Sequence, residues 1–249
     1  MAIFNTVPPL QAGAGIKFDG LTISTAAAPR NLLDNSDFTN LVAQAGIGGN
    51  HGTVAYAADR WILDSGTVSY AAGVGLTLNG TIRQKLEFPP TGDAISFVGM
   101  ASGEASIRYE DRAVTITSSG GVLKWAALYK GSYTAETLPE YQPKGYCAEL
   151  EECQRYYFRI TSDWLYGHAI EGEGFNILVI ALTQMRSINI TVENSGIKVY
   201  NDGTWHEVSI VNVKHLGGGM YEIVCALNET FAMGASYLIT GITALNSDL

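Results

Sequence analysis

The chain has 249 residues, of which 47% are hydrophobic and 16% are charged, and its formal net charge is −9. This length and apolar fraction suit one large or two smaller domains with a packed core. The negative charge argues against non-specific binding to nucleic acid or to anionic membranes, because both of these partners are polyanions.

The first residues, MAIFNTVPPLQAGAG, contain neither a basic segment nor a long apolar segment, so they do not form a secretory signal. No apolar run approaches the roughly 20 residues of a membrane span, and no membrane insertion is expected. We therefore expect synthesis in a cytoplasm, without a signal peptide. The cysteines Cys147, Cys153 and Cys225 are odd in number and are interpreted as free thiols that act as small buried hydrophobes.

Residues 1–30 are interpreted as an extended N-terminal arm that becomes ordered against another molecule. They contain Pro8-Pro9, scattered glycines and an alanine run before Pro29. A short strand at 20–24 is the one segment there with the pattern of a core element.

From residue 31 to residue 146, short alternating segments predict an antiparallel, jelly-roll-like β-sandwich. The segment LTLNGTIRQKLEF (76–88) alternates on either side of a turn predicted at Asn79-Gly80. Further strands are predicted at AISFVGM (94–100), EASIRYE (104–110), AVTITSS (113–119) and VLKWAALYKG (122–131). In EASIRYE, Ala105, Ile107 and Tyr109 share one face.

A short α-helix is predicted at residues 147–157, within AELEECQRYYFRI (148–160). Leu150, Cys153 and Tyr157 follow helical spacing, and Glu151 and Arg155 form an i, i+4 pair in the favoured order. Because two to three turns are marginal alone, this helix needs a surface to lie on. It is expected to join the first sandwich to a second one.

Residues 158–249 predict a second antiparallel β-sandwich, which makes the chain all-β with two sandwich domains, a joining helix and the arm. Predicted strands are FNILVIAL (175–182), SINITVE (187–193) with Ile188, Ile190 and Val192 inward, MYEIVCAL (220–227) and SYLITGITAL (236–245). Within IKVYNDGTWHEVSI (197–210), Asp202-Gly203 predicts a two-residue hairpin turn, since glycine reaches positive φ without strain.

The order of several segments resembles tail-fibre or receptor-binding proteins of bacteriophages and prophages. These segments are NLLDNSDF (31–38), DRW (59–61), GTIRQKLE (80–87), WAALYKGSYTAETLPEYQPKGYCAELEECQRYYFRI (125–160), Met185-Arg186 and the terminal ALNSDL. The resemblance implies a jelly roll like those of carbohydrate-binding modules, a helix with Cys-Gln-Arg-Tyr-Tyr and a small β-domain. It also implies a homotrimer at the tail tip of a virion, which binds a host surface glycan or receptor. Residues 1–30 would dock onto other tail proteins.

Motifs of catalysis are missing: the sequence has no GxSxG, no Walker-type loop and no GxGxxG after a strand. His206-Glu207 begins like HExxH, but position 210 is Ile and the segment predicts a strand. Glu171 and Glu173 are interpreted as members of a solvated loop rather than as a glycosidase pair. No catalytic residue and no cofactor are therefore predicted.

A structural calcium ion is the one metal that the sequence suggests. Asp34, Asn35 and Asp37 supply clustered oxygen ligands at the start of the jelly roll. The same residue types also make turns, and the turn interpretation is favoured over the ion.

Aromatic side chains in polar loops are the candidate glycan contacts, because sugar rings stack on Trp and Tyr while polar groups bind their hydroxyls. Two loops combine these residue types: 162–174, with Trp164, Tyr166 and His168, and the hairpin with Trp205 and His206. Trp61 and Trp125 lie in strand-like contexts and are expected to be buried.

Three functions follow from these features. The first is a non-enzymatic adhesin of a phage tail that recognises a bacterial surface structure. The second is a polysaccharide depolymerase, and the third is a structural tail or baseplate connector. The absence of catalytic motifs favours the first and the third.

Overall fold

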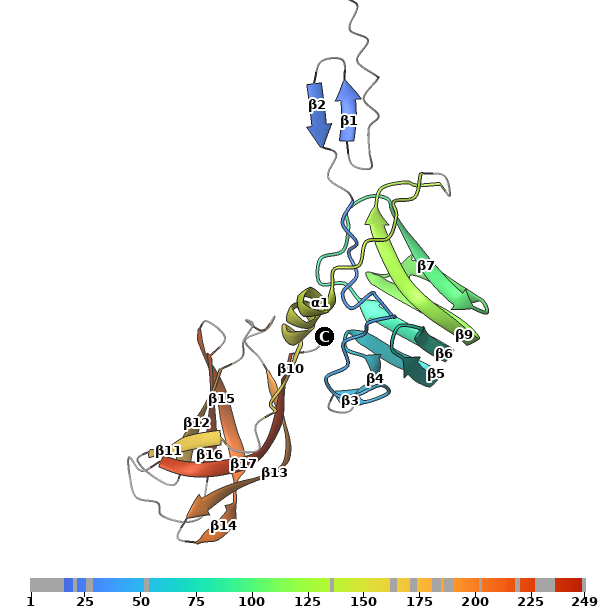
Figure 1. Ribbon diagram of the computed structural model, residues 1–249. Helices are drawn as coiled ribbons and strands as arrows, with labels where there is room; N and C mark the ends of the chain where they lie inside the picture. The colour runs from blue at the N-terminus through green and yellow to red at the C-terminus, as the bar shows by residue number, and fades with distance from the viewer. Residues whose placement is uncertain are drawn as a thin grey trace, which may run out of the picture.

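The computed structural model consists of antiparallel β-sheets and one short helix among the residues that it describes (Figure 1). These are residues 16–19, 22–25, 29–51, 54–134, 137–161, 165–170, 174–180, 185, 190–201, 203–217, 220–226 and 236–247. The predicted all-β fold class, with sandwich-like antiparallel sheets, is confirmed.

The first sheet has the strand order β3-β4-β5-β6-β9-β7, and β8 pairs with β9. Its strands are β3 (Asn50–His51), β4 (Val54–Ala58), β5 (Trp61–Ala71), β6 (Gly75–Lys85), β7 (Ala94–Ser102), β8 (Ala105–Glu110) and β9 (Ala113–Lys130). Its inward side chains form one buried cluster around Trp61 and Ile116, and Leu33 and Phe38 join this cluster from the segment before β3. As predicted, the alternate residues of β8 that include Ile107 pack against the cluster.

Glycine explains two errors in the strand prediction for this sheet. The predicted turn at Asn79-Gly80 is wrong, because β6 runs straight through both residues with a register shift next to Leu78. A Cβ on Gly80 would lie 2.1 Å from the carbonyl oxygen of Ser65, so glycine permits the close approach of β5 here. The two strands predicted at 113–119 and 122–131 are the single strand β9. Gly120, with φ +88°, is the extra residue of a bulge within it.

The second sheet has the strand order β14-β13-β17-β11-β12-β16-β15, and β10 pairs with β17. Its strands are β10 (Tyr157–Arg159), β11 (Leu165–Ile170), β12 (Gly174–Ile180), β13 (Thr191–Asn201), β14 (Thr204–Glu207), β15 (Ser209–Gly217), β16 (Met220–Ala226) and β17 (Ser236–Asn246). A separate buried cluster, which includes Val199, Ile223 and Ile239, forms its core.

The strongest local prediction in the second sheet, a hairpin at Asp202-Gly203, is confirmed. Asn201 pairs with Thr204 across β13 and β14, and Gly203 has φ +82°. The inward positions of Ile190 and Val192 are also confirmed, while Ile188 lies outside the described residues. The segments predicted as separate strands at 187–193 and 197–201 are joined in β13, which has register shifts against β17 on both sides of Asn194.

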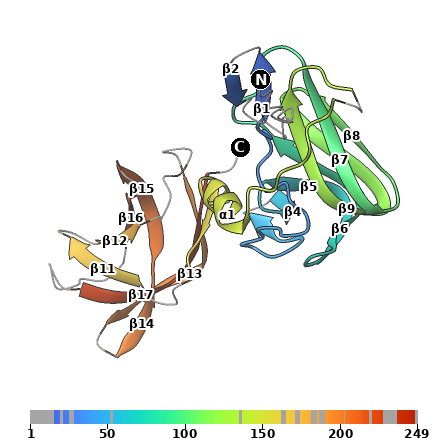
Figure 2. The same cartoon turned by 45° about the horizontal axis from the view of Figure 1, so that its top comes forward.

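Helix α1 (Tyr146–Gln154) is the only helix in the described chain, and it lies between the two sheets in both views (Figures 1 and 2). It ends earlier than predicted, because Tyr157 already pairs with Asn246 as the first residue of β10. Its buried residues are Glu149 and Cys153, while Leu150 is half-buried and Tyr157, which is also buried, lies beyond the helix in β10. No described helix is long and apolar enough to cross a membrane.

The predicted partner of Arg155 within the helix is wrong. Arg155 lies beyond the last turn, where its Nη2 is 3.1 Å from the Glu87 carboxylate instead of pairing with Glu151. Near the other end of the helix, Cys147 is exposed, so the prediction that all cysteines are buried holds only for Cys153 and Cys225.

The N-terminal arm contains more regular structure than its sequence pattern indicates. Strands β1 (Ile16–Asp19) and β2 (Thr22–Thr25) form an antiparallel hairpin, in which Asp19 pairs with Thr22. Among the described strands, these two pair only with each other. A two-stranded hairpin is at best marginally stable alone in water, which is consistent with an arm that needs a partner.

Candidate functional site

The segment NLLDNSDF joins the first sheet to helix α1. Asn35 lies at its centre with a left-handed backbone (φ 48°) and a fully buried side chain. Its Nδ2 donates to the carbonyl oxygens of Val42 and Asp59 at 2.8 and 2.7 Å, and its Oδ1 accepts from the Val42 amide at 2.9 Å. Asn35 therefore ties its own segment to Val42, seven residues on, and to Asp59, 24 residues on.

The helix binds to this segment through Glu149. The Glu149 carboxylate accepts hydrogen bonds from the backbone amides of Asn35 and Ser36. Burial raises the pKa of Glu149, and Lys144 nearby opposes that rise. A carboxylate from the first turn of the helix thus satisfies two backbone donors that no strand binds.

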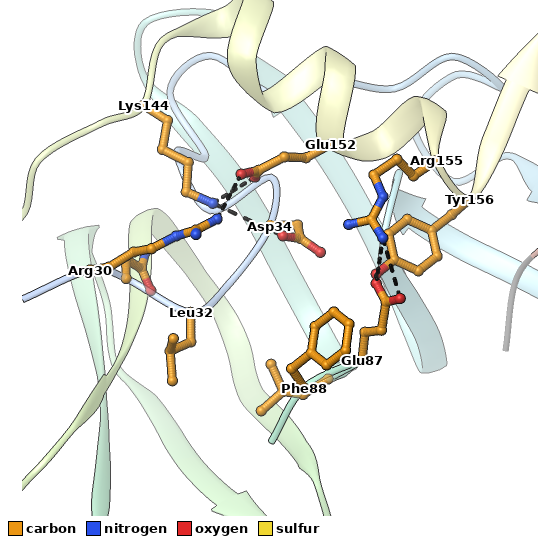
Figure 3. A pocket seen from close by; sticks show the side chains of 11 residues that line it. Arg30, Leu32, Asp34, Glu87, Phe88, Lys144, Glu152, Arg155 and Tyr156 are labelled. Atoms are coloured by element: carbon orange, nitrogen blue, oxygen red, sulfur yellow. Dashed lines mark hydrogen bonds and ion pairs between the residues drawn. The ribbon is translucent and has the colours of Figure 1, made fainter. Parts of the chain in front are cut away.

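A cavity of about 170 Å³ opens where the helix, the start of this segment and the end of β6 meet (Figure 3). Its lining combines charged groups with a few apolar ones. The lining residues are Arg30, Asn31, Leu32, Asp34, Leu86, Glu87, Phe88, Lys144, Glu152, Arg155 and Tyr156.

On one side of the cavity, charges are paired around Lys144 (Figure 3). Its Nζ lies 2.6 Å from Oε2 of Glu152 and donates to the carbonyl oxygen of Leu33 at 2.9 Å. Asp34 lies 3.1 Å from Nε of Arg60, and Arg30 reaches Glu152 at 3.4 Å. The two carboxylates on this side are therefore each bound to a cation.

On the other side, Glu87 is the acceptor for two groups. It accepts from Nη2 of Arg155 and, at 2.7 Å, from the hydroxyl of Tyr156. Burial raises the pKa of Tyr156, so this hydroxyl stays a donor at neutral pH. The guanidinium of Arg60 lies 3.4 Å from the centre of the Tyr156 ring and stacks on it.

The calcium candidates Asp34, Asn35 and Asp37 do not converge. Asp34 pairs with Arg60, the Asn35 amide binds backbone groups, and Oδ1 of Asp37 accepts from the amide and hydroxyl of Thr39 at 3.0 and 2.6 Å. Within the described ranges, no three His, Cys, Asp or Glu side chains are placed to hold a metal ion. Asp37 and Thr39 form the kind of local turn that the sequence favoured.

The first predicted aromatic loop is partly a strand. Trp164 lies outside the described residues, while Tyr166 and His168 belong to β11. The Tyr166 side chain is 71% exposed, so it is among the most accessible aromatic groups of the described chain. For the predicted buried tryptophans, Trp61 is fully buried, whereas Trp125 is only partly buried and stacks on Tyr141.

The predicted hairpin residues lie on β14. Trp205 is exposed and faces Tyr200 of β13, with ring centres 5.1 Å apart and planes tilted by 53°. His206 is half-buried and pairs with Val199. Trp205 and His206 therefore point to opposite faces of the sheet, as alternate strand residues must.

The sheet brings Tyr166 and Trp205 onto one surface. Tyr200 pairs with Trp205 on one side and with Leu238 of β17 on the other, and Leu238 pairs with Tyr166. Directly paired residues of antiparallel strands share a face, so these four side chains form one row across β14, β13, β17 and β11. We call Tyr166, Tyr200, Trp205 and Leu238 the aromatic row.

Polar groups flank the aromatic row on the same face. The next row on this face consists of Glu207, Lys198 and Thr240, which lie two residues from Trp205, Tyr200 and Leu238 on their strands. Nζ of Lys198 lies 4.0 Å from the Glu207 carboxylate. At strand spacings of about 4.8 Å, the aromatic row spans about 14 Å. This surface combines apolar ring faces with hydrogen-bonding groups over the length of a few sugar units.

The sequence reasoning missed Tyr200, Leu238 and Phe88. Alternation around the hairpin turn could have found Tyr200, since a two-residue turn places it opposite Trp205. Leu238 and Tyr166 required the pairing of strands far apart in sequence. Comparisons of the chain with protein-family models, with curated proteins and with solved structures found no match.

Proposed function

We propose that this chain is a non-enzymatic receptor-binding protein of a phage or prophage tail, and that it binds a saccharide of the host surface through the aromatic row. The observation that carries the proposal is the row itself. Trp205, Tyr200 and Tyr166 are 37%, 41% and 71% exposed, although large aromatic side chains usually lie in the core.

The chemistry of the row suits a sugar chain. The apolar faces of pyranose rings pack on aromatic rings, and the hydroxyl groups at their edges bind polar side chains. Lys198, Glu207 and Thr240 lie beside the row and supply such groups. A row on a β-sheet is also rigid, so little conformational entropy is lost when a ligand binds.

Binding without bond cleavage is supported by the pairing of the carboxylates in the cavity between the helix and the end of β6, which we call the junction cavity. Asp34, Glu87 and Glu152 are each paired with a cation or hydrogen-bonded donor. Hydrolysis of a glycosidic bond instead needs one carboxyl group whose pKa is raised, facing another across the substrate.

A tail protein binds its receptor more tightly when several copies bind together. Weak single-site contacts held rigidly together increase the effective affinity by about 10²–10⁴. We therefore include in the proposal a homotrimer that presents three rows, and attachment to other tail proteins through residues 1–30. The β1–β2 hairpin in that arm supplies backbone edges to which a partner can bind.

Labelled protein mixed with a panel of bacterial strains tests the proposal. Binding to a susceptible strain should fall when the surface carbohydrate is oxidised with periodate. It should also fall about tenfold, or 1.4 kcal/mol, in Trp205→Ala. Tyr146→Ala, which removes an exposed tyrosine from the helix, is the matched control and should bind normally.

Binding that is unaffected by periodate and by Trp205→Ala would refute the proposal. Release of reducing ends from purified capsule or lipopolysaccharide would instead identify a depolymerase. Assembly with a tail protein, without binding to any strain, would identify a connector.

A further inference from the structure

We infer that the junction cavity is a second binding site, which takes a sugar unit that carries an anionic group, either a carboxylate or a phosphate. This site lies on the first sheet and the helix, away from the aromatic row on the second sheet. The inference does not depend on the row, but it shares with the proposed function the premise that the ligand is a saccharide.

The exposed charges at the cavity mouth are positive, and the negative ones lie deeper. The side chains of Arg30 and Arg155 are 78% and 37% exposed, whereas those of Asp34, Glu87 and Glu152 are 22%, 18% and 24% exposed. A ligand therefore meets guanidinium groups first, although the whole chain carries a net charge of −9. Guanidinium groups bind carboxylates and phosphates with two parallel hydrogen bonds.

The two arginines keep donors for a ligand. Arg30 contacts Glu152 at 3.4 Å, and that carboxylate is held more closely by Lys144, at 2.6 Å. Arg30 can therefore turn towards a ligand without leaving Glu152 unpaired. The bonds of Arg155 to Glu87 use Nη2, which leaves its Nε and Nη1 outside these bonds.

An apolar surface lies between the two arginines (Figure 3). Phe88 is 75% exposed, the largest exposure among the big hydrophobic residues of the described chain, and Leu32 and Leu86 also line the cavity. An exposed ring next to paired charges offers a stacking face for the C–H side of a sugar ring.

The size of the cavity limits the ligand to a small group. Its volume of about 170 Å³ is below the range of about 300–1,000 Å³ in which pockets enclose a whole drug-sized ligand. One sugar unit with its anionic group, at the end or in a branch of a longer glycan, fits this limit.

Three probes with one scaffold test the inference: glucuronate, glucose 6-phosphate and glucose. Saturation-transfer NMR titrations of the full chain should show at least tenfold tighter binding of one or both anionic probes than of glucose. Comparing glucuronate with glucose 6-phosphate shows whether the cavity prefers a carboxylate or a phosphate. Raising the salt concentration should weaken the binding, because the arginines at the mouth are exposed to solvent.

Variants then locate the site. Arg30→Gln should remove the tenfold preference, and Phe88→Ala should weaken all three probes. Arg108→Gln, an equally exposed arginine on β8, is the matched control and should leave the titrations unchanged. Trp205→Ala should not affect binding of the anionic probes, which separates this site from the aromatic row.

The inference is overturned if glucose binds as tightly as the anionic probes, if no probe binds, or if Arg30→Gln keeps the preference. The proposed function survives each of these results as long as Trp205→Ala still reduces binding to cells. Loss of cell binding in Arg30→Gln together with the anionic preference would tie the cavity to the natural receptor.

Discussion

Replacing Asn35 by alanine should strongly destabilise the first sheet, and the size of the effect follows from its contacts. The substitution removes three hydrogen bonds, which the Asn35 side chain makes to the amide and carbonyl of Val42 and to the carbonyl of Asp59, while the Val42 carbonyl keeps a bond from the Asp59 amide at 3.2 Å. Each lost partner costs about 1 kcal/mol or more. The left-handed backbone at φ 48° adds about 1 kcal/mol for alanine, because asparagine tolerates this conformation better. The expected loss is therefore about 4 kcal/mol.

Urea unfolding followed by tryptophan fluorescence measures this loss, since Trp61 donates to the carbonyl of Asn35 itself at 2.8 Å. With an m-value of about 2 kcal/mol per M, the midpoint should fall by about 2 M. Asn40→Ala, which changes an exposed asparagine five residues further along the chain, is the matched control and should alter stability by no more than about 0.5 kcal/mol. A midpoint for Asn35→Ala that equals that of the control would show that the Asn35 contacts do not hold this segment.

Three further results are expected. Burial raises the pKa of Glu149 above its ordinary value of 4.5, so its contribution to stability is fully present below pH 4.5 and is lost as the pH rises through the folded-state pKa. Urea titrations at several pH values give the free energy of unfolding of the native chain relative to that of Glu149→Gln. This difference should fall as the pH rises from 4 towards 7, and a rise would contradict the assignment. Gly99→Ala should cost about 1–3 kcal/mol in thermal unfolding, because a Cβ there would lie 2.2 Å from the Trp125 ring. Gly92→Ala, with no atom within 4 Å of its Cβ, should cost only the strain of its positive φ, and equal losses would rule out the ring contact. A thiol reagent should modify Cys147 quickly and the two buried cysteines only after unfolding, and fast reaction of all three would contradict their burial.

Much of the strand content followed from the sequence, because period-two alternation depends only on neighbouring residues. The hairpin at Asp202-Gly203 and the inward face of β8 are examples. The turn predicted at Asn79-Gly80 was wrong because this prediction also used only neighbouring residues. A glycine that lets two strands approach closely has the same sequence pattern as one that makes a turn, and the neighbouring strand distinguishes the two cases.

The helix shows the same limit on a smaller scale. Its presence was predicted from spacing and charge, but its buried face and the partner of Arg155 were not. Glu149 is buried because the backbone amides of Asn35 and Ser36, more than 100 residues earlier in the chain, need an acceptor. Arg155 pairs with Glu87 because the end of β6 lies beside the end of the helix.

The sequence by itself determined the all-β class and the presence of a short helix, and it singled out Tyr166 and Trp205 as candidate aromatic contacts. Tertiary structure alone decided that these two side chains lie in one row, because β13 and β17 place Tyr200 and Leu238 between them. It also decided that Phe88 and the two arginines surround one cavity. The physical reason is that a binding surface is formed by strand pairing and packing between distant segments, whereas sequence patterns describe the environment of each segment alone.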